Sequence, residues 1–416
     1  MIKTVHEYDR IYKEDFNSSF DELKSFLCSE KTGAKYDDLV KYSTSGGKEY
    51  LQVKNYAGVI AFRNGDMLEI LPKKISSEEN DDAYKRLLMR MLETVHNVHS
   101  EVRQFTSIGI EKLPLLEVFI HMFIGELDLL VKKGLRGSYI EIEENSTAFK
   151  GKMLFNKQIQ YNSVNKQRCY CITDEFSLNR PENRLIKSTL CSLCKISKYY
   201  RNQNELHRLI TVFEEIEAST DIKGDFSKCL KDRNLVHYEL VLSWCEVFLN
   251  GMSFTSYSGR ESAYAILFPM EKLFEAYIAA EMKKTIAHTD EFKGLRLTTQ
   301  ETLYNLYGDQ NKGNLRPDIV VRGNNCSYIF DTKWKNENKN GVSQGDLYQM
   351  FAYQKKYLQS GSRCKCTVLL YPDAREEQFT DKSDGLRLDV KKIDLMNDAK
   401  GNVREQLKKI IEWAGK

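Results

Sequence analysis

The chain has 416 residues, more than one ordinary hydrophobic core organises, so two or three domains are expected. Hydrophobic residues make up 41% and charged residues 29%, and there is no low-complexity tract, which excludes a disordered or fibrous protein. The formal net charge is only +3, so any binding of nucleic acid must come from local basic patches and not from a globally cationic surface.

The first 76 residues are predicted to form a β-rich module. A helical pattern at residues 20–27 precedes β-prone segments at 50–53, 59–62 and 67–70. Asn64-Gly65 separates the last two segments, and Asn-Gly favours a hairpin turn because both residue types accept a positive φ.

Residues 77–258 are predicted to form a helical body that contains a β insertion at about 136–174. Helical spacing of apolar residues is found at 83–99, 113–133 and 183–250. Strands are expected inside the insertion at 138–143, 152–160 and 168–173. The most apolar stretch, 113–131, carries several ionisable residues, which indicates a buried helix and not a membrane span.

The ten cysteines are scattered, and the charged sequence that follows Met1 does not have the pattern of an export signal. We therefore expect a cytoplasmic protein with reduced thiols and no membrane partner. Cys191 and Cys194 have the spacing of half a zinc site, but they lie in a helical pattern without a second pair, which favours buried apolar thiols.

The segment Gly251–Gly259, rich in small and polar residues, is the predicted boundary of a third domain, residues 259–416. Beyond it, helical and β-prone segments alternate, which indicates a mixed sheet flanked by helices. Helices are expected at 270–285, 347–358 and 403–413, and strands near 295 and at 318–321, 328–334 and 367–371.

This third domain contains the most informative motif. Arg316-Pro317-Asp318 begins one strand, and Asp331-Thr332-Lys333 ends the next, with a Gly-Asn-Asn turn between the strands. Side chains alternate between the faces of a strand, so Asp331 and Lys333 point to the same side. A hairpin through the turn would place Asp318 beside Asp331.

Two close carboxylates are difficult to ionise together without a cation, and Mg²⁺ prefers oxygen ligands that include one or two carboxylates. We therefore predict that Asp318 and Asp331 bind Mg²⁺, which Mn²⁺ would replace, and that Lys333 activates water and stabilises the phosphorus centre during phosphodiester hydrolysis. This pattern is typical of PD-(D/E)xK nucleases. The alternative is a surface hairpin with a chance Asp-x-Lys.

Three further residues are candidates for the same site. Glu275, on the helix before the motif, would complete the metal site, or would be an ordinary exposed helix residue. Gln349 and Tyr353 are four residues apart on one helix face and would reach the active site or a phosphate. A packing role for Tyr353 is the alternative.

The chain resembles the McrC-type subunits of McrBC modification-dependent restriction systems over most of its length. The matching segments are Gly58–Ile60, Glu69–Lys73, Phe149–Lys152, Asp174–Asn179, Glu182–Lys187, Asp318, Asp331, Lys333 and Leu347–Met350. The resemblance implies a DNA endonuclease subunit that acts in phage defence. It also implies a partner, a hexameric McrB-like AAA+ GTPase that this subunit stimulates, and a double-stranded, modified DNA substrate.

The absence of a nucleotide-binding motif agrees with a separate GTPase partner. Ser45-Gly46-Gly47-Lys48 superficially resembles a P-loop, but Tyr42 stands where the first glycine is required and Glu49 replaces Ser or Thr, which predicts a plain loop. The partner is expected to contact the N-terminal module and the β insertion, where basic residues would serve the GTPase or DNA. These residues are Arg136, Lys150 and Lys152.

Two other functions remain open from the residues alone. One is an activator of an AAA+ partner whose nuclease site is vestigial, although the presence of Asp318, Asp331 and Lys333 disfavours it. The other is a stand-alone repair or recombination nuclease, although the long region before the third domain favours a protein that depends on a partner.

Overall fold

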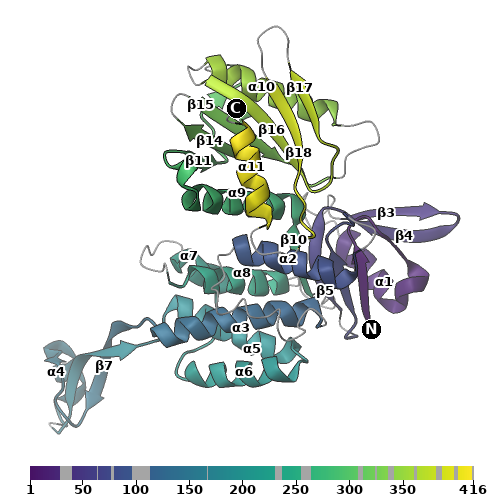
Figure 1. The fold of residues 1–416 in the computed structure, drawn as a ribbon. Helices are drawn as coiled ribbons and strands as arrows, with labels where there is room; N and C mark the ends of the chain where they lie inside the picture. Colours follow the sequence, from purple (N-terminus) through teal and green to yellow (C-terminus); the bar gives the residue numbers. More distant parts are fainter. Residues whose placement is uncertain are drawn as a thin grey trace. The chain divides into compact units, whose positions relative to one another are not determined.

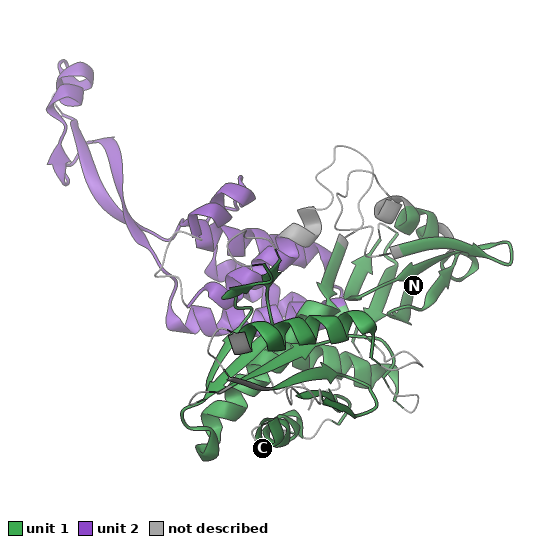
Figure 2. Cartoon of the chain, turned by 90° about the horizontal axis from the view of Figure 1, so that it is seen from above, with its two compact units in different colours: residues 1–98, 106–115, 254–416 green, residues 99–105, 116–253 purple. Residues whose placement is uncertain are grey.

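The computed structural model describes residues 1–28, 40–62, 64–75, 79–95, 113–165, 167–229, 237–253, 264–307, 313–323, 326–335, 342–359, 363–380, 387–397 and 402–414. It forms two compact units (Figure 2). Unit 1 contains residues 1–98, 106–115 and 254–416, and unit 2 contains residues 99–105 and 116–253. In the described residues unit 1 has helices and several sheets, and unit 2 has helices and one sheet, which confirms the predicted mixed α/β class.

The units do not follow the three consecutive domains expected from the sequence. The N-terminal module and the region after residue 253 share unit 1, because β10 (Tyr264–Pro269) pairs antiparallel with β5 (Tyr56–Ala61). The predicted boundary segment begins inside helix α8, which ends at Ser253, and its remaining residues lie outside the described part of the chain. Which segments fold independently stays a prediction.

The N-terminal part of unit 1 is built from two sheets and helix α1 (Lys13–Cys28). The first sheet has the order β1-β6-β5-β10 and the second has the order β2-β4-β3. Apolar side chains from both sheets and from α1, among them Ile11, Phe16 and Leu51, form one buried cluster. The remaining strands are β1 (Ile2–His6), β2 (Arg10–Tyr12), β3 (Val40–Ser45), β4 (Lys48–Val53) and β6 (Met67–Leu71).

Two turns that the sequence singled out are hairpins. β5 and β6 pair antiparallel around Asn64-Gly65, where Gly65 has a φ of 84°. Gly46 and Gly47 join β3 to β4 with φ values of 58° and 79°, and Ser45 pairs with Lys48. Positive φ at two successive residues is the geometry of a two-residue hairpin turn. The P-loop-like sequence is therefore a turn between strands, as predicted.

The C-terminal part of unit 1 is a six-stranded mixed sheet with the order β11-β14-β15-β16-β18-β17 (Figure 1). Helix α10 (Gln344–Gln359) packs on one face through a buried cluster that includes Met350 and Tyr357. Helices α9 (Met270–His288) and α11 (Asn402–Ala414) pack on each other and contact β15 and β16. The strands are β11 (Arg296–Thr299), β14 (Ile319–Gly323), β15 (Cys326–Thr332), β16 (Arg363–Tyr371), β17 (Glu377–Thr380) and β18 (Arg387–Lys392).

Three smaller elements complete unit 1. The two-stranded sheet β12-β13 consists of Tyr304–Asn305 and Asn314–Leu315, and a 3-10 turn spans Asp290–Phe292. Helix α2 (Asp81–Val95), from the N-terminal part of the chain, packs against α9. This contact and the β5–β10 pairing join the two ends of the sequence in one folded body.

Unit 2 is helical apart from one small sheet. Its helices are α3 (Leu115–Lys133), α4 (Phe155–Asn162), α5 (Pro181–Ile196), α6 (Tyr200–Val212), α7 (Ile222–Cys229) and α8 (Glu239–Ser253). The sheet, with the order β7-β9-β8, consists of β7 (Ser138–Ser146), β8 (Lys152–Met153) and β9 (Cys169–Ser177). No helix in the described part of the chain is long and apolar enough to span a bilayer.

Strands β7 and β9 pair antiparallel and, together with β8 and α4, extend away from the helices of their own unit; we call residues 138–165 and 167–177 the β arm (Figure 2). It corresponds to the predicted β insertion. The prediction of a strand at 152–160 is wrong, however, because only Lys152–Met153 forms a strand and helix α4 follows it. Asn162 at the end of α4 accepts and donates hydrogen bonds with Asn145 of β7, a contact that a single segment cannot reveal.

The pairing of β5 with β10 can be tested at Gly58. Its φ is +147°, and a Cβ built there would lie 2.0 Å from the carbonyl oxygen of Ile266 on β10. We expect Gly58→Ala to lower the free energy of unfolding by about 2 kcal/mol or more, because the strand must move or the backbone must be strained. Thermal unfolding measures this.

Gly345→Ala is the matched control, since a Cβ there meets nothing within 4 Å. A Gly58→Ala protein as stable as the Gly345→Ala protein would show that β10 does not pair with β5 as described.

Candidate active site

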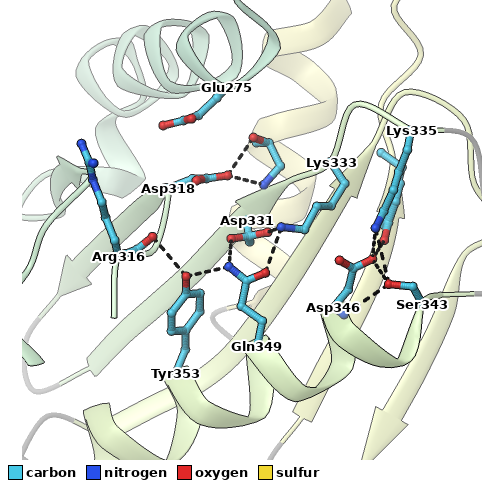
Figure 3. Close-up of polar contacts among 12 residues, drawn as sticks. Glu275, Arg316, Asp318, Asp331, Lys333, Lys335, Ser343, Asp346, Gln349 and Tyr353 are labelled. Atoms are coloured by element: carbon cyan, nitrogen blue, oxygen red, sulfur yellow. Dashed lines mark hydrogen bonds and ion pairs between the residues drawn. The ribbon is translucent and has the colours of Figure 1, made fainter. Parts of the chain in front are cut away.

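The pairing of β14 with β15 brings the two predicted carboxylates together. Ile319 is paired with Phe330, so Asp318 and Asp331 stand opposite each other one position further along the hairpin. Opposite residues of an antiparallel pair project from the same face. Asp318 Oδ2 accepts hydrogen bonds from the Thr332 backbone N at 2.8 Å and from Thr332 Oγ1 at 2.9 Å, which fixes its carboxylate beside the end of β15 (Figure 3).

Lys333 and Asp331 point to the same side, as predicted. The Lys333 ammonium forms an ion pair with Asp331 Oδ2, and the Asp331 side chain is only 1% exposed. The Lys333 backbone N donates to Leu370 O at 2.9 Å, which continues the parallel ladder between β15 and β16. The backbone of Lys333 is therefore held by β16, and its side chain extends toward Asp331 at the end of β15.

Gln349 and Tyr353 are part of the same cluster. Lys333 Nζ donates to Gln349 Oε1 at 3.0 Å, and Gln349 Nε2 donates to Asp331 Oδ1 at 3.4 Å and to Tyr353 OH at 2.8 Å. Tyr353 OH donates to Arg316 O at 3.1 Å, just before Asp318. Tyr353 is also buried in the core under α10, so the structural and the polar roles coexist.

The start of α10 is fixed by residues that the sequence analysis missed. Ser343 Oγ accepts the Asp346 backbone N at 3.3 Å and donates to Asp346 Oδ2 at 2.7 Å. Asp346 also accepts a hydrogen bond from Tyr371 OH at 3.0 Å and forms an ion pair with Lys335. Ser-x-x-Asp before an apolar helix is a recognisable start signal, so this cap was available in the sequence.

Glu275 lies on α9, and its side chain is near Asp318, on the side away from Gln349 and Tyr353 (Figure 3). Its carboxylate accepts a hydrogen bond from Gln300 Nε2, and the Gln300 backbone N donates to Asp318 O at 3.0 Å. Gln300 has a φ of 53°, a conformation uncommon for a residue other than glycine. It connects Glu275 to Asp318, and no motif in the sequence indicated it.

The electrostatics of the site follow from burying like charges together. Burial raises the pKa of Asp331 to about 6, and the nearby Asp318 carboxylate adds to this, whereas Lys333 opposes it. Burial disfavours the charged form of Lys333, but the carboxylates of Asp331 and Asp318 outweigh it and raise the lysine pKa. Burial, followed by the Asp318 charge, also raises the pKa of Glu275.

The donor set fits a hard divalent cation. Within the described part of the chain, Asp331 Oδ2 is buried, forms an ion pair with Lys333 and accepts no hydrogen bond of normal geometry. Among the described residues no three Asp, Glu, His or Cys side chains form a complete metal-ligand cluster. Two carboxylates with water in the remaining positions are sufficient for Mg²⁺, and they suit zinc poorly.

Comparisons with known proteins identify one family. The model of the family described as "McrBC 5-methylcytosine restriction system component" matches residues 51–372, well over half of the chain. No curated protein matches. The resemblance drawn from the sequence motifs is therefore confirmed at the level of the family.

Two solved structures have a similar fold. One is a refined half-complex from a tetradecameric assembly of Thermococcus gammatolerans McrB AAA+ hexamers with bound McrC, with a TM-score of 0.72 and 17% identity over 99% of this chain and 100% of the other. The second is the Thermococcus gammatolerans McrBC complex, with a TM-score of 0.53 and 18% identity over 70% of this chain and 89% of the other.

The ion pair between Lys333 and Asp331 predicts a pH-dependent stability. A carboxyl group whose folded pKa lies above its unfolded value costs stability as the pH rises through that interval, here from about 4 to about 6. Lys333→Met removes the opposing charge and extends the interval upward. We expect its free energy of unfolding, relative to that of the unchanged protein, to fall as the pH is raised from 5 to 8, by about 1.4 kcal/mol for each further pKa unit. The unfolding temperature should fall with it.

Thermal unfolding without metal between pH 5 and pH 8 measures this effect. Lys293→Met is the control, because it removes the same charge from a fully exposed pair with Asp290. Parallel pH profiles for the Lys333→Met and unchanged proteins would contradict the described ion pair.

Proposed function

Because this chain belongs to the McrBC family of restriction-system components, we propose that it is the DNA-cutting subunit of such a system, a Mg²⁺-dependent endonuclease of the PD-(D/E)xK type. The observation that carries the proposal is the convergence of Asp318, Asp331 and Lys333 at the end of one hairpin. A mixed sheet with helices on its faces, which holds these residues at strand ends, is in keeping with that nuclease fold.

Asp318 and Asp331 would hold the magnesium ion, and Mn²⁺ would replace it. When bound, the ion supplies positive charge to the scissile phosphate and makes water more acidic. The raised pKa of Asp331 is consistent with this role, since a cation between the carboxylates would favour the ionised form.

The remaining polar side chains would position the attacking water and the phosphate. Lys333 would donate hydrogen bonds to the water or to a phosphate oxygen, where its ammonium offsets the negative charge that develops at phosphorus. Gln349 holds Lys333 and Asp331 at a fixed separation through its two amide atoms. Glu275, on the Asp318 side, would orient water through its carboxylate, and burial together with the Asp318 charge raises its pKa, which makes the carboxylate a better proton acceptor than an exposed one.

We further propose that the subunit acts with a McrB-like AAA+ GTPase hexamer that it stimulates and that is needed to recognise modified double-stranded DNA. The fold shared with chains of two McrBC complexes supports this partner. The turn at Gly46-Gly47 agrees, because the P-loop-like sequence lies between two strands and does not lead into a helix.

The β arm has the surface expected of a partner contact. Large apolar side chains are exposed on it, at Tyr139, Ile140, Phe149, Phe155, Ile159, Tyr161, Val164 and Phe176, with exposed fractions between 44% and 95%. Exposed apolar residues gathered on one element indicate a protein interaction site. Lys150 and Lys152 are exposed on the same arm, and Arg136 just before it is half-buried, with its backbone N bonded to Tyr238 OH at 2.7 Å. All three remain candidates to bind the GTPase or DNA.

The catalytic assignment is tested with Asp331→Asn, which keeps the side-chain shape and removes the charge. We expect loss of Mg²⁺-dependent DNA cleavage by at least about a thousandfold, because an amide binds Mg²⁺ weakly and no longer pairs with Lys333. Mg²⁺ should raise the unfolding temperature of the unchanged protein and leave that of the variant unaffected.

Stimulation of the partner GTPase should survive Asp331→Asn, since the β arm is unchanged. Asp290→Asn, which alters an exposed carboxylate of the same unit, is the control and should cut normally. Cleavage at the normal rate by Asp331→Asn would refute the site. Absence of cleavage by the unchanged protein, beside normal GTPase stimulation, would instead favour a vestigial nuclease.

The partner contact is tested on α4, where Phe155 and Ile159 are each 69% exposed and lie one helical turn apart. Replacing both with serine should weaken GTPase stimulation or partner affinity at least about tenfold, because buried apolar anchors dominate interface energies. Thermal stability should hardly change. Val212→Ser, at an exposed position on α6, is the control, and equal stimulation by both variants would exclude the arm from the contact.

A further inference from the structure

Trp334 immediately follows Lys333 and is fully buried, with 2% of its surface exposed. Its indole Nε1 donates a hydrogen bond of 2.9 Å to Glu7 Oε2. Glu7 follows strand β1 at the other end of the sequence, 327 positions away. The residue next to the candidate catalytic lysine is therefore bonded to the N-terminal module of unit 1.

The acceptor at Glu7 is itself held firmly. The Glu7 backbone N donates to Leu71 O at 3.0 Å, and Glu7 Oε2 also accepts the Lys73 backbone N at 2.8 Å. Glu7 is 3% exposed and Lys73 is also 3% exposed. Both contacts lie at the ends of the paired strands β1 and β6, so the carboxylate is anchored to a sheet and not to a loose segment.

The ring of Trp334 makes two further contacts. The Lys73 ammonium lies 4.9 Å from its centroid, a cation–π arrangement. The centroid of the Phe274 ring lies 5.3 Å from the centroid of the Trp334 ring, and Phe274 directly precedes Glu275 on α9. One side chain thus adjoins both Lys333 and the residue before Glu275, while being held by Glu7 and Lys73.

This arrangement costs more than an apolar cluster would. Within the described part of the chain, Glu7 Oε1 and Lys73 Nζ are buried and make no hydrogen bond. Burial raises the pKa of Glu7 to about 7 and lowers that of Lys73 to about 8, so both groups are forced toward their neutral forms. Apolar side chains in place of Glu7 and Lys73 would make the fold more stable. The two polar residues are therefore better explained by the orientation that they impose on Trp334.

We infer that Trp334 is a positioning residue for Lys333 and Glu275, and that Glu7 of the N-terminal module holds it in place through the indole N–H. This inference rests on the proposed nuclease function. The effect of Trp334 passes through the backbone of Lys333, its neighbour in the chain, and through the ring of Phe274. A displacement of about 1 Å in a reacting group is enough to slow catalysis about a hundredfold.

The test is a double-mutant cycle in the full-length chain, assayed with its McrB-like GTPase on methylated plasmid DNA and Mg²⁺. Trp334→Phe keeps an aromatic ring against Phe274 and removes the N–H, and Glu7→Ala removes the acceptor. Each should lower kcat for cleavage about tenfold to a hundredfold with KM for DNA changed less than about twofold. The double variant should be no slower than the slower single variant, since both remove the same hydrogen bond.

Glu7→Gln provides the conservative rescue, because its amide oxygen can still accept the indole N–H, and it should keep kcat within about threefold of the unchanged protein. It also remains informative if Glu7→Ala fails to fold. Trp413→Phe is the matched control, a tryptophan of the same unit whose ring centroid lies 4.0 Å from Arg387 Cζ in a cation–π arrangement. It should cut at the normal rate.

A second readout needs neither metal nor activity. The indole ¹⁵N–¹H resonance of Trp334 is the one that disappears in Trp334→Phe. In metal-free protein it should exchange with solvent at least about tenfold faster in Glu7→Ala, and close to normally in Glu7→Gln, because loss of the acceptor frees the N–H.

The outcomes distinguish a failure of the proposed nuclease activity from a failure of the positioning role of Trp334. No cleavage by the unchanged protein with its partner would overturn the nuclease proposal and this inference with it. Normal kcat in both single variants, beside an active unchanged protein, would overturn the inference alone. Additive losses in the double variant, or an indole exchange rate insensitive to Glu7→Ala, would also overturn it.

Discussion

Two carboxylates of like charge, Asp318 and Asp331, are held against each other at the buried end of one hairpin, and much of the surrounding structure keeps them there. Left alone they would repel, and the buried one would remain protonated at moderately acid pH. Thr332 binds Asp318 through two hydrogen bonds, while Lys333 and Gln349 hold Asp331. The fold thus stores an electrostatic cost that a divalent cation would relieve.

The residues around that pair come from three different elements. β15 supplies Thr332 and Lys333, α10 supplies Gln349, and α9 supplies Glu275 through the bridge made by Gln300. Because these elements pack on one sheet, a shift in any of them changes the distance between charges. This explains why the capped start of α10 and the burial of Trp334 matter to a site that neither directly forms.

Local sequence patterns predicted many of the strands, turns and side-chain directions of this region. They did not predict contacts between segments that are distant in the sequence. The alternation from Tyr328 to Lys333 was enough to place Asp331 and Lys333 on one face, and Asn64-Gly65 was enough for a hairpin. No local pattern links β10 to β5 or Trp334 to Glu7, since both contacts join residues about two hundred or more positions apart. α4 was taken for a strand because eight residues with mixed spacing do not distinguish the two structures.

The pairing of β10 with β5 also sets an order of events on the ribosome. Strand β5 is synthesised early, but its neighbour emerges only after the whole of unit 2. Until then β5 presents an open edge, the kind of surface that invites pairing with another nascent chain. Translation of unit 2 acts as a delay, and a cell would gain by shielding the early sheet, for instance with a chaperone, until the last third of the polypeptide arrives.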